Sequence, residues 1–334
     1  MHTIFEAVSE ATPGIKWQNI FRRTWPLYKR WYLSQGTVDR PTYKTCRNRL
    51  IEFMPELIPV YDQLRELTAG SDMASRFLSL YCPPAYISGC SQLIWPAPEA
   101  RLIRNYDYSP RRLDGVIINS SWLGKNVIAM SDCLIGVLDG MNEDGLCVSL
   151  TFGGSRHVGK GFGIPIILRY ILETCENAKQ AQLALERIPT HMAYNVTVID
   201  AHGDYFTAHL FPGKDAIIDR KQRIATNHQP YDIKWKSYAN ASATLAREAE
   251  LEKYLALGDM NFQQIANAFH YPPLYSTDFK NGFSTLYTSI YYPNEKIVEL
   301  RWPDSNWILD FPNFSEGKRT INYRTDGAVT IQNS

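Results

Sequence analysis

The first part of the chain spaces its apolar residues with the period of an α-helix. Between Trp17 and Thr68, and most clearly from Leu50 to Leu67, apolar side chains recur at spacings of one, three and four residues. Such segments place their apolar residues on one face, which packs against a core. The pattern predicts an all-α block that ends at the connection from Cys82 to Gly89.

After this connection the pattern changes to short β-type runs separated by turn residues. The predicted strands are Arg101–Tyr108, Val116–Ser121, Asn126–Met130, Leu146–Phe152, Tyr194–Asp200 and Tyr205–Phe211, with a hairpin formed by Phe283–Tyr292 and Lys296–Trp302. Longer amphipathic runs predict helices at Ile164–Cys175, Ala178–Ile188, Ala241–Leu257 and Asn261–Phe269. Strand groups separated by helices predict antiparallel sheets with helices outside, an α+β fold. The polar tail after Asn313 is expected to be peripheral.

Composition narrows the class of protein. The 334 residues carry 35 Lys and Arg against 34 Asp and Glu, a balance that argues against a dedicated nucleic-acid binder. The N-terminus is acidic where a signal peptide would be basic, and no apolar run is long enough to cross a bilayer. The six cysteines show no metal-ligand or disulfide spacing. We expect a cytoplasmic protein with reduced thiols, no membrane span, no metal and no cofactor.

The pair Gly89-Cys90 is the main candidate for chemistry. A thiol directly after glycine is placed to attack the preceding carbonyl, because glycine permits the bent backbone that this N-to-S shift requires. Cleavage would leave the thiol and a free α-amine on one residue. That amine, with a pKa of roughly 7.7–8.0, is able to accept the thiol proton. The alternative interpretation of the pair is a turn beside a buried core cysteine.

Four further motifs follow Gly89-Cys90 along the chain. They are Arg104-Asn105-Tyr106-Asp107, Asp139-Gly140-Met141-Asn142-Glu143-Asp144-Gly145-Leu146, Leu150-Thr151-Phe152 and Ala225-Thr226-Asn227-His228. In this order the five motifs resemble those of the cysteine N-terminal nucleophile (Ntn) hydrolases. The similarity is to the choloylglycine hydrolase and penicillin V acylase group, and more closely to the isopenicillin N acyltransferase-like branch, whose members place a helical segment before the nucleophile.

The resemblance implies a fold, a maturation step and an activity. It implies a four-layer αββα core and self-cleavage between Gly89 and Cys90. The helical segment 1–89 would stay bound to the 90–334 subunit as a heterodimer, which can assemble further into a homo-oligomer. The mature enzyme would hydrolyse or transfer the acyl group of a small linear amide or thioester through a thioester on Cys90.

The resemblance also implies roles for individual residues. Asp107 would orient the nucleophile, and Arg104 would lie near the thiol and favour the thiolate. Asn227 and the backbone N–H of Thr151 would stabilise the oxyanion. Arg247 matches a late active-site arginine of the family only loosely.

Several of these residues also have interpretations of their own. Arg104 and Asp107 are three residues apart and predict a charge-assisted pair. Asn227 suits either an oxyanion donor or an Asx turn, and Arg247 suits either the active site or a solvent-facing helix position. The 140–145 segment is expected to be a hairpin turn whose glycines take positive φ.

Two alternative functions remain at the level of sequence. Cys90 would stay internal and pair with a distant histidine, as in papain-like proteases, or the fold would serve as a non-catalytic binding module. The candidate histidines are His157, His191 and His228. Aromatic residues near the motifs suit either an apolar acyl pocket or the core. These are Trp95, Tyr106, Tyr108, Trp122, Phe152 and Tyr231.

Overall fold

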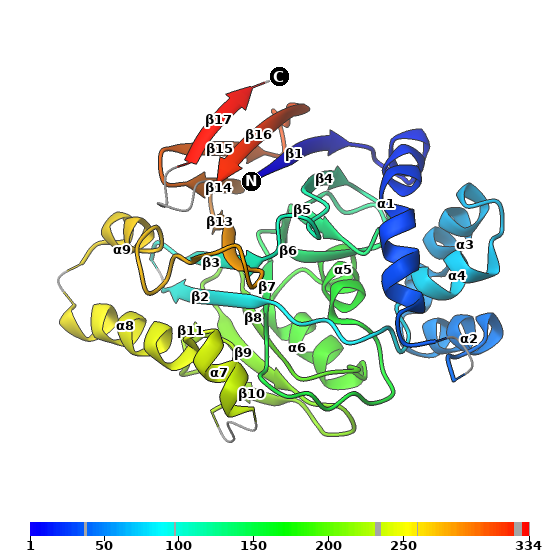
Figure 1. Cartoon of the computed structure of the whole chain (residues 1–334), viewed down its shortest axis with the longest axis horizontal. Helices are drawn as coiled ribbons and strands as arrows, with labels where there is room; N and C mark the ends of the chain where they lie inside the picture. Colours follow the sequence, from blue (N-terminus) through cyan, green and yellow to red (C-terminus); the bar gives the residue numbers. More distant parts are fainter. Residues whose placement is uncertain (37–38, 97, 231–234, 259, 324–328, 334) are drawn as a thin grey trace.

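Two β-sheets packed face to face form the centre of the molecule, which we describe from a computed structural model (Figure 1). The structure describes residues 1–36, 39–96, 98–230, 235–258, 260–323 and 329–333. Within these ranges the larger sheet has the order β10-β9-β8-β7-β6-β5-β4-β1-β16-β17 and the smaller one β11-β2-β3-β13-β14-β15, with β12 beside β13. All strand pairs are antiparallel except β1 with β4.

The strands of the larger sheet come from the whole length of the chain. They are β1 (His2–Ser9), β4 (Val116–Ser120), β5 (Val127–Asp132), β6 (Gly136–Asn142), β7 (Cys147–Phe152), β8 (Tyr194–Ile199), β9 (Tyr205–Leu210), β10 (Ile217–Asp219), β16 (Gly317–Tyr323) and β17 (Val329–Asn333). The smaller sheet consists of β2 (Gly89–Trp95), β3 (Arg101–Tyr108), β11 (Ile224–Ala225), β12 (Thr277–Asp278), β13 (Phe283–Tyr292), β14 (Ile297–Trp302) and β15 (Ser305–Asp310).

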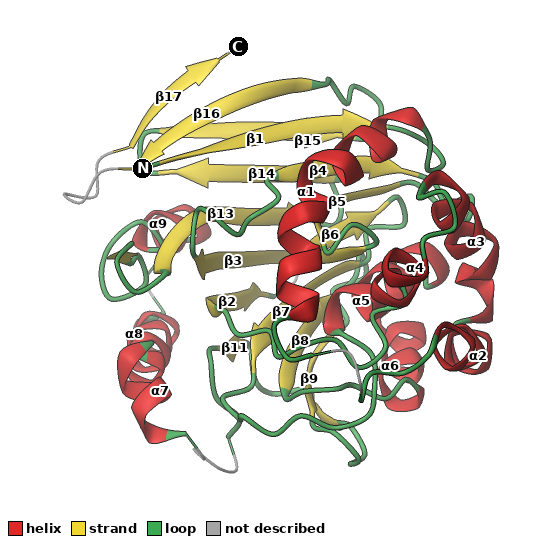
Figure 2. Cartoon of the chain, turned by 45° about the vertical axis from the view of Figure 1, so that its right-hand side comes forward, coloured by secondary structure: helices red, strands yellow, loops and turns green. Residues whose placement is uncertain are grey.

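Helices cover the outer faces of both sheets. The larger sheet carries α5 (Ile164–Thr174) and α6 (Ala178–Arg187), and the smaller sheet carries α8 (Thr244–Leu257) and α9 (Phe262–Ala268), preceded by α7 (Lys236–Ala241). Figure 2 shows α8 and α9 on one side of the strands and α5 and α6 on the other. The two sheets meet through β2, β7 and β8. The prediction of an α+β fold with αββα layers is confirmed.

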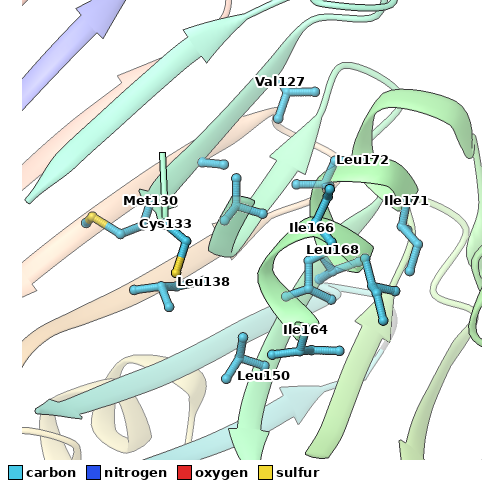
Figure 3. Close-up of a cluster of buried hydrophobic side chains, with 14 of the residues drawn as sticks. Val127, Met130, Cys133, Leu138, Leu150, Ile164, Ile166, Leu168, Ile171 and Leu172 are labelled. Atoms are coloured by element: carbon cyan, nitrogen blue, oxygen red, sulfur yellow. The ribbon is translucent and has the colours of Figure 1, made fainter. Parts of the chain in front are cut away.

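The packing of α5 explains why the larger sheet needs glycine. The apolar side chains of α5 interlock with those of β5, β6 and β7 (Figure 3). A Cβ on Gly136 would lie 2.4 Å from the Pro165 Cβ, and one on Gly140 would lie 2.8 Å from Leu172 Cδ1. Gly140 therefore lies in strand β6 and permits the close approach of α5, so its prediction as a turn glycine was wrong. Gly145 does take a positive φ of 84°.

The segment before Cys90 is helical over the predicted range, and it also contributes a strand to the larger sheet. It contains α1 (Ile15–Leu33), α2 (Tyr43–Phe53), the short η1 (Pro55–Leu57), α3 (Ile58–Leu67) and α4 (Asp72–Leu78). Before them, β1 enters the larger sheet between β4 and β16, although the sequence did not predict this strand. The tail was expected to be peripheral, yet β16 pairs with β1 along its length. No helix in the described ranges is long and apolar enough to cross a membrane.

Candidate active site

Strand β2 places the Cys90 thiol between the two sheets. In its pairing with β3, Gly89 lies opposite Asp107 and Cys90 opposite Tyr106. Successive side chains of a strand point to opposite faces. Gln92, on the same face as Cys90, contacts Ser149 and Thr197 of the larger sheet. Leu93, on the other face, packs in the small core beneath α8 and α9. The thiol therefore faces the inter-sheet layer.

The thiol is fully buried beside a guanidinium. Arg104 Nη2 donates a hydrogen bond to Cys90 Sγ at 3.2 Å, and the Ser88 hydroxyl lies 3.7 Å from the sulfur. Burial raises the pKa of the Cys90 thiol, while the positive charge of Arg104 acts against this rise. In the intact chain the thiol is thus held mainly in its protonated form next to a group that favours the thiolate.

Arg104 is itself held by a buried carboxylate. Its Nη1 donates to Asp139 Oδ2 at 2.5 Å, and its Nε donates to the Leu150 carbonyl at 3.0 Å. Asp139 also accepts hydrogen bonds from Tyr287 at 3.1 Å and Tyr291 at 2.8 Å. The predicted pair of Arg104 with Asp107 was wrong, because residues three apart on a strand point to opposite faces.

Asp107 and Arg247 meet on the outer face of β2 and β3. Arg247 of α8 is 2% exposed, and its Nη1 lies 3.1 Å from Asp107 Oδ2. The same nitrogen donates to the Cys90 carbonyl at 2.7 Å and to the Ser91 hydroxyl at 2.9 Å. Burial raises the pKa of Asp107, and the Arg247 charge opposes the rise. The alternative of a solvent-facing Arg247 was wrong, since α8 directs this side chain inward.

Asn227 contacts the backbone on both sides of Gly89. Its Oδ1 accepts the Cys90 N–H at 2.9 Å and a hydrogen bond from Arg247 Nη2 at 2.6 Å. Its Nδ2 donates to the Ser88 carbonyl at 3.3 Å. The Asn227 backbone N–H donates to Thr244 Oγ1 at 2.7 Å, which fixes the segment after β11. These contacts do not form the Asx turn that was the alternative interpretation of Asn227.

Thr151 joins this arrangement indirectly. Its hydroxyl donates to the Thr226 carbonyl at 2.7 Å and accepts a hydrogen bond from Asn195 at 3.0 Å. Thr151 therefore ties β7 to the residue before Asn227. Among the hydrogen bonds of the described residues, none joins Thr151 directly to Cys90.

The sequence matches a known family over most of this region. Residues 96–307 match the acyl-coenzyme A:6-aminopenicillanic acid acyl-transferase family. The chain belongs to this family. The matched range contains Arg104, Asp107, Thr151, Asn227 and Arg247, and it begins shortly after Cys90. No curated protein sequence matches the chain.

Several solved structures are similar to this acyl-transferase family member. Penicillin V acylase from Agrobacterium tumefaciens is 14% identical, with 69% of this chain and 90% of that chain covered and a TM-score of 0.45. A mutant of the conjugated bile acid hydrolase from Clostridium perfringens is 14% identical over 73% and 96%, with a TM-score of 0.42. The Caenorhabditis elegans ortholog of N-acylethanolamine-hydrolyzing acid amidase is 16% identical over 66% and 99%, with a TM-score of 0.47. The family assignment rests on the sequence match.

Gly89 of this family member serves close packing. Its φ lies outside the left-handed region, so the expected backbone strain is not what requires glycine here. A Cβ at Gly89 would lie 2.9 Å from the Asp107 Cβ and 3.3 Å from its Oδ2. A side chain before Cys90 would thus push against the carboxylate that holds Arg247.

Tyr238 is a site residue that the sequence reasoning missed. Its hydroxyl, carried by α7, donates to the Ser88 carbonyl at 2.7 Å. It shares this acceptor with Asn227 Nδ2. No motif marks Tyr238, and the predicted helix began only at Ala241, after this residue.

The candidate histidines lie elsewhere among the described residues. The His191 ring lies 3.2 Å from the Phe162 carbonyl, His228 lies 3.1 Å from Glu248, and His157 stacks on Phe211. The hydrogen bonds of the Cys90 thiol involve Ser88 and Arg104 instead. This geometry does not support a papain-like pair.

The aromatic residues near the motifs divide between core and surface. Tyr106, Trp122 and Phe152 are buried, and Trp95 packs against the small core. Tyr108 lines a cavity beside the 87–89 segment. Tyr231 lies outside the described residues.

Proposed function

We propose that this chain is a self-processing Ntn amidohydrolase or acyltransferase that uses Cys90 as its nucleophile. The observation that carries the proposal is the set of contacts around the Gly89–Cys90 bond: Asn227 binds the Cys90 N–H of that bond and the Ser88 carbonyl just before it, while Arg104 contacts the Cys90 sulfur. Residues from distant parts of the chain thus meet around the bond whose cleavage the family resemblance implies.

The maturation step is an N-to-S acyl shift followed by hydrolysis. Cys90 Sγ attacks the Gly89 carbonyl carbon, the thiol proton passes to the Cys90 nitrogen, and the C–N bond breaks. The product is a thioester between Gly89 and the Cys90 sulfur. Water then cleaves the thioester, which releases the Gly89 carboxyl group and a Cys90 with a free thiol and a free α-amine.

The same groups support turnover of an external amide. The α-amine of Cys90, with a pKa of roughly 7.7–8.0, takes the thiol proton and later gives it to the leaving amine. In the uncleaved chain Asn227 Oδ1 accepts a hydrogen bond from the Cys90 N–H, and after cleavage it would orient the amine that forms from this group. Arg104, at 3.2 Å from the sulfur, favours the thiolate.

The oxyanion of the tetrahedral intermediate would be stabilised by hydrogen-bond donors, one of which binds a backbone carbonyl in the uncleaved chain. Asn227 Nδ2 donates to the Ser88 carbonyl and, at 3.4 Å, to the Phe152 carbonyl, and it would lose the first of these acceptors if Ser88 moves away after cleavage. We assign it, with the Thr151 backbone N–H, to the tetrahedral intermediate. The acyl-enzyme thioester on Cys90 then passes its acyl group to water or to an amine.

The two fragments produced by cleavage would remain associated as one complex. Residues 1–89 contribute β1, which lies between β4 and β16 of the 90–334 part. The cleaved enzyme is therefore proposed to be a heterodimer of Met1–Gly89 and Cys90–Ser334, whose substrates are small acyl amides.

Intact-mass measurement together with an amide screen tests this function. The purified protein should resolve into two fragments that break at Gly89–Cys90, and it should hydrolyse at least one amide among N-acyl amino acids, penicillin V, acyl-homoserine lactones and conjugated bile acids. Cys90→Ala should abolish both cleavage and turnover. Retention of either by Cys90→Ala would refute the assignment, and an uncleaved protein that is inactive on the whole screen would favour the binding-module alternative.

A further inference from the structure

A cavity adjoins the residues immediately before Cys90. Its volume is about 690 Å³, and the described part of its wall includes Ile87, Tyr108, Tyr238 and Phe283. Tyr238, one of these lining residues, donates its hydroxyl hydrogen to the Ser88 carbonyl at 2.7 Å. The Phe283 ring comes within 3.4 Å of the position that a Gly89 Cβ would take. The cavity thus ends at the acyl side of the Gly89–Cys90 bond.

The inner part of the cavity is aromatic and its rim is cationic. Tyr238 is almost fully buried, while Arg111, Arg112 and Lys280 on the rim are exposed. No acidic residue is among the described lining residues, and none of the described acids forms an ion pair with these three cations. Asp278, two residues before Lys280, is bound by the Asn281 backbone and side chain.

The direction of the chain indicates which half of a substrate enters the cavity. Ile87-Ser88-Gly89 is the acyl side of the bond that Cys90 attacks first, and Ile87 lines the cavity. An external amide attacked by the same sulfur must place its own carbonyl where the Gly89 carbonyl was. Its acyl portion then follows the path of Ile87 and Ser88, past Tyr238 and Phe283 toward the rim.

We propose that this cavity is the acyl site of the mature enzyme and that Arg111, Arg112 and Lys280 select acyl groups with a carboxylate at the far end. This inference rests on the proposed function, because it takes Cys90 as the attacking group. The aromatic wall accepts the apolar body of the acyl group. Three like charges with no described acid among them attract an anion and do so less strongly at high salt.

Two isosteric amides test the selection. We would compare 4-carboxyphenylacetyl-p-nitroanilide with 4-carbamoylphenylacetyl-p-nitroanilide, which differ in charge but hardly in shape. The processed enzyme should favour the carboxylate in kcat/KM by roughly tenfold, mainly through KM, which corresponds to about 1.4 kcal/mol. The preference should shrink when the salt concentration rises.

Substitution of the rim gives the decisive comparison. The triple variant Arg111→Gln, Arg112→Gln and Lys280→Gln should lose the preference and keep its activity on the carbamoyl amide. Lys179→Gln, an exposed lysine on α6 at the opposite side of the sandwich, serves as the control and should behave as the wild type. Equal kcat/KM values for the two amides in the wild type, or a preference that survives in the triple variant, would overturn the proposal.

A binding measurement separates this proposal from the proposed function. Isothermal titration of the protein as purified with the slowly reacting N-methylamides of the same two acids reports affinity without turnover. Tighter binding of the carboxylate form that disappears in the triple variant supports the acyl site even if no anilide is hydrolysed. Equal binding of the two forms, together with hydrolysis of either anilide, contradicts the acyl site and leaves the nucleophile assignment standing.

Discussion

At the scale of single residues, different groups hold Cys90 from the two faces of strand β2. The Cys90 thiol points inward to Arg104, whereas the Cys90 carbonyl is bound by Arg247 from the outer helix layer. Asn227 links the two sides, because its Oδ1 accepts from both Cys90 N–H and Arg247. Under the proposed function, Asn227 would thus hold the Cys90 nitrogen in place before cleavage turns it into the catalytic amine.

Replacement of Asn227 by alanine should slow acylation. Loss of one oxyanion donor costs roughly a hundredfold to a thousandfold in rate. The burst rate of a chromogenic amide with the processed protein measures this step. Asn267→Ala, at an exposed position of α9, provides the control and should leave the rate unchanged. An Asn227→Ala enzyme with the wild-type burst rate would show that the oxyanion is stabilised elsewhere.

Replacement of Arg104 should move the pH dependence of Cys90. A positive charge at 3.2 Å stabilises the thiolate and lowers the thiol pKa, so its removal raises that pKa. In the processed form of Arg104→Gln, the rate of Cys90 alkylation by iodoacetamide should therefore begin to rise at a higher pH than in the processed wild type. Arg104→Lys, which keeps the charge, should shift the profile less.

The Arg104 substitutions also leave Asp139 with a changed partner. Removing one member of a buried ion pair costs about 3–5 kcal/mol, so the folded fraction of each variant must be checked by circular dichroism. Folded Arg104→Gln and wild-type proteins with superimposable alkylation profiles would exclude an effect of Arg104 on the thiol.

At the scale of elements, β1 holds the segment before Cys90 in the larger sheet. Phe5 of this strand is fully buried, and its ring centroid lies 5.9 Å from that of Tyr287 and 5.1 Å from that of Trp302. The neighbouring residue, Ile4, is 51% exposed. The two positions therefore form a matched pair, one facing the core and one facing away from it.

Phe5→Ala should weaken the attachment of residues 1–89. Deletion of a buried phenylalanine ring costs about 3–5 kcal/mol, whereas exposed substitutions usually stay within about 0.5 kcal/mol. Urea denaturation followed by tryptophan fluorescence should give a clearly lower free energy of unfolding for Phe5→Ala than for Ile4→Ala. Similar losses for both variants would mean that β1 does not pack as described.

Helix α1 meets the core at a pair of carboxyl groups. The Tyr28 hydroxyl donates to Asp114 at 2.6 Å and also lies 3.4 Å from Asp132, which accepts a hydrogen bond from the Cys133 thiol. Burial, and next the charge of the other carboxylate, raises the pKa of Asp114 to about 8; burial raises the pKa of Asp132 to about 6. The two groups titrate as a pair.

This pair should make the stability of the protein fall as the pH rises. A carboxyl group whose pKa is higher in the folded state stabilises that state fully below its unfolded pKa, near roughly 3.9, and loses this contribution as the pH rises through its folded pKa. Asp114→Asn, which stays neutral, should therefore flatten the decline in melting temperature between pH 5 and pH 9. Parallel curves for wild type and Asp114→Asn would contradict the raised pKa.

Elements that form unbroken apolar or β-type runs were predictable, even where the strand is buried on both faces. The runs at β3, β7 and α5 gave bounds within a residue or two of the structure. Strand β6 is also fully buried, but it was missed because its Gly140 resembles a turn residue. Strand β2 was not predicted, because its first two residues were interpreted as a cleavage site in a connecting segment.

The site was predictable as a set of residue types but not as a set of contacts. The motifs named Cys90, Arg104, Asp107 and Asn227, and the structure brings all four to the Gly89–Cys90 bond or its neighbours. The partner of Arg104 is Asp139, which reaches it only through the packing of two sheets. Pairing across sheets depends on topology, which local spacing does not encode.

At the scale of the whole molecule, the proposed function couples burial with cleavage. Cys90 has no exposed surface in the uncleaved chain, and Ile87, three residues before it, lines the cavity that Tyr238 and Phe283 also line. We therefore expect an external amide to reach the sulfur only after the 87–89 segment has moved. The break at Gly89–Cys90 would therefore create the amine and open the path at the same time.

Mapping the acyl-enzyme tests this account most directly. A turnover reaction quenched in acid, digested and read by mass spectrometry locates the trapped acyl group, and prior labelling with an amine-specific reagent shows whether the α-amine is free. The account predicts an acyl group on the sulfur of a peptide that begins at Cys90 and carries the amine label. An acyl group on a peptide that still runs through Ser88, Gly89 and Cys90 would contradict it.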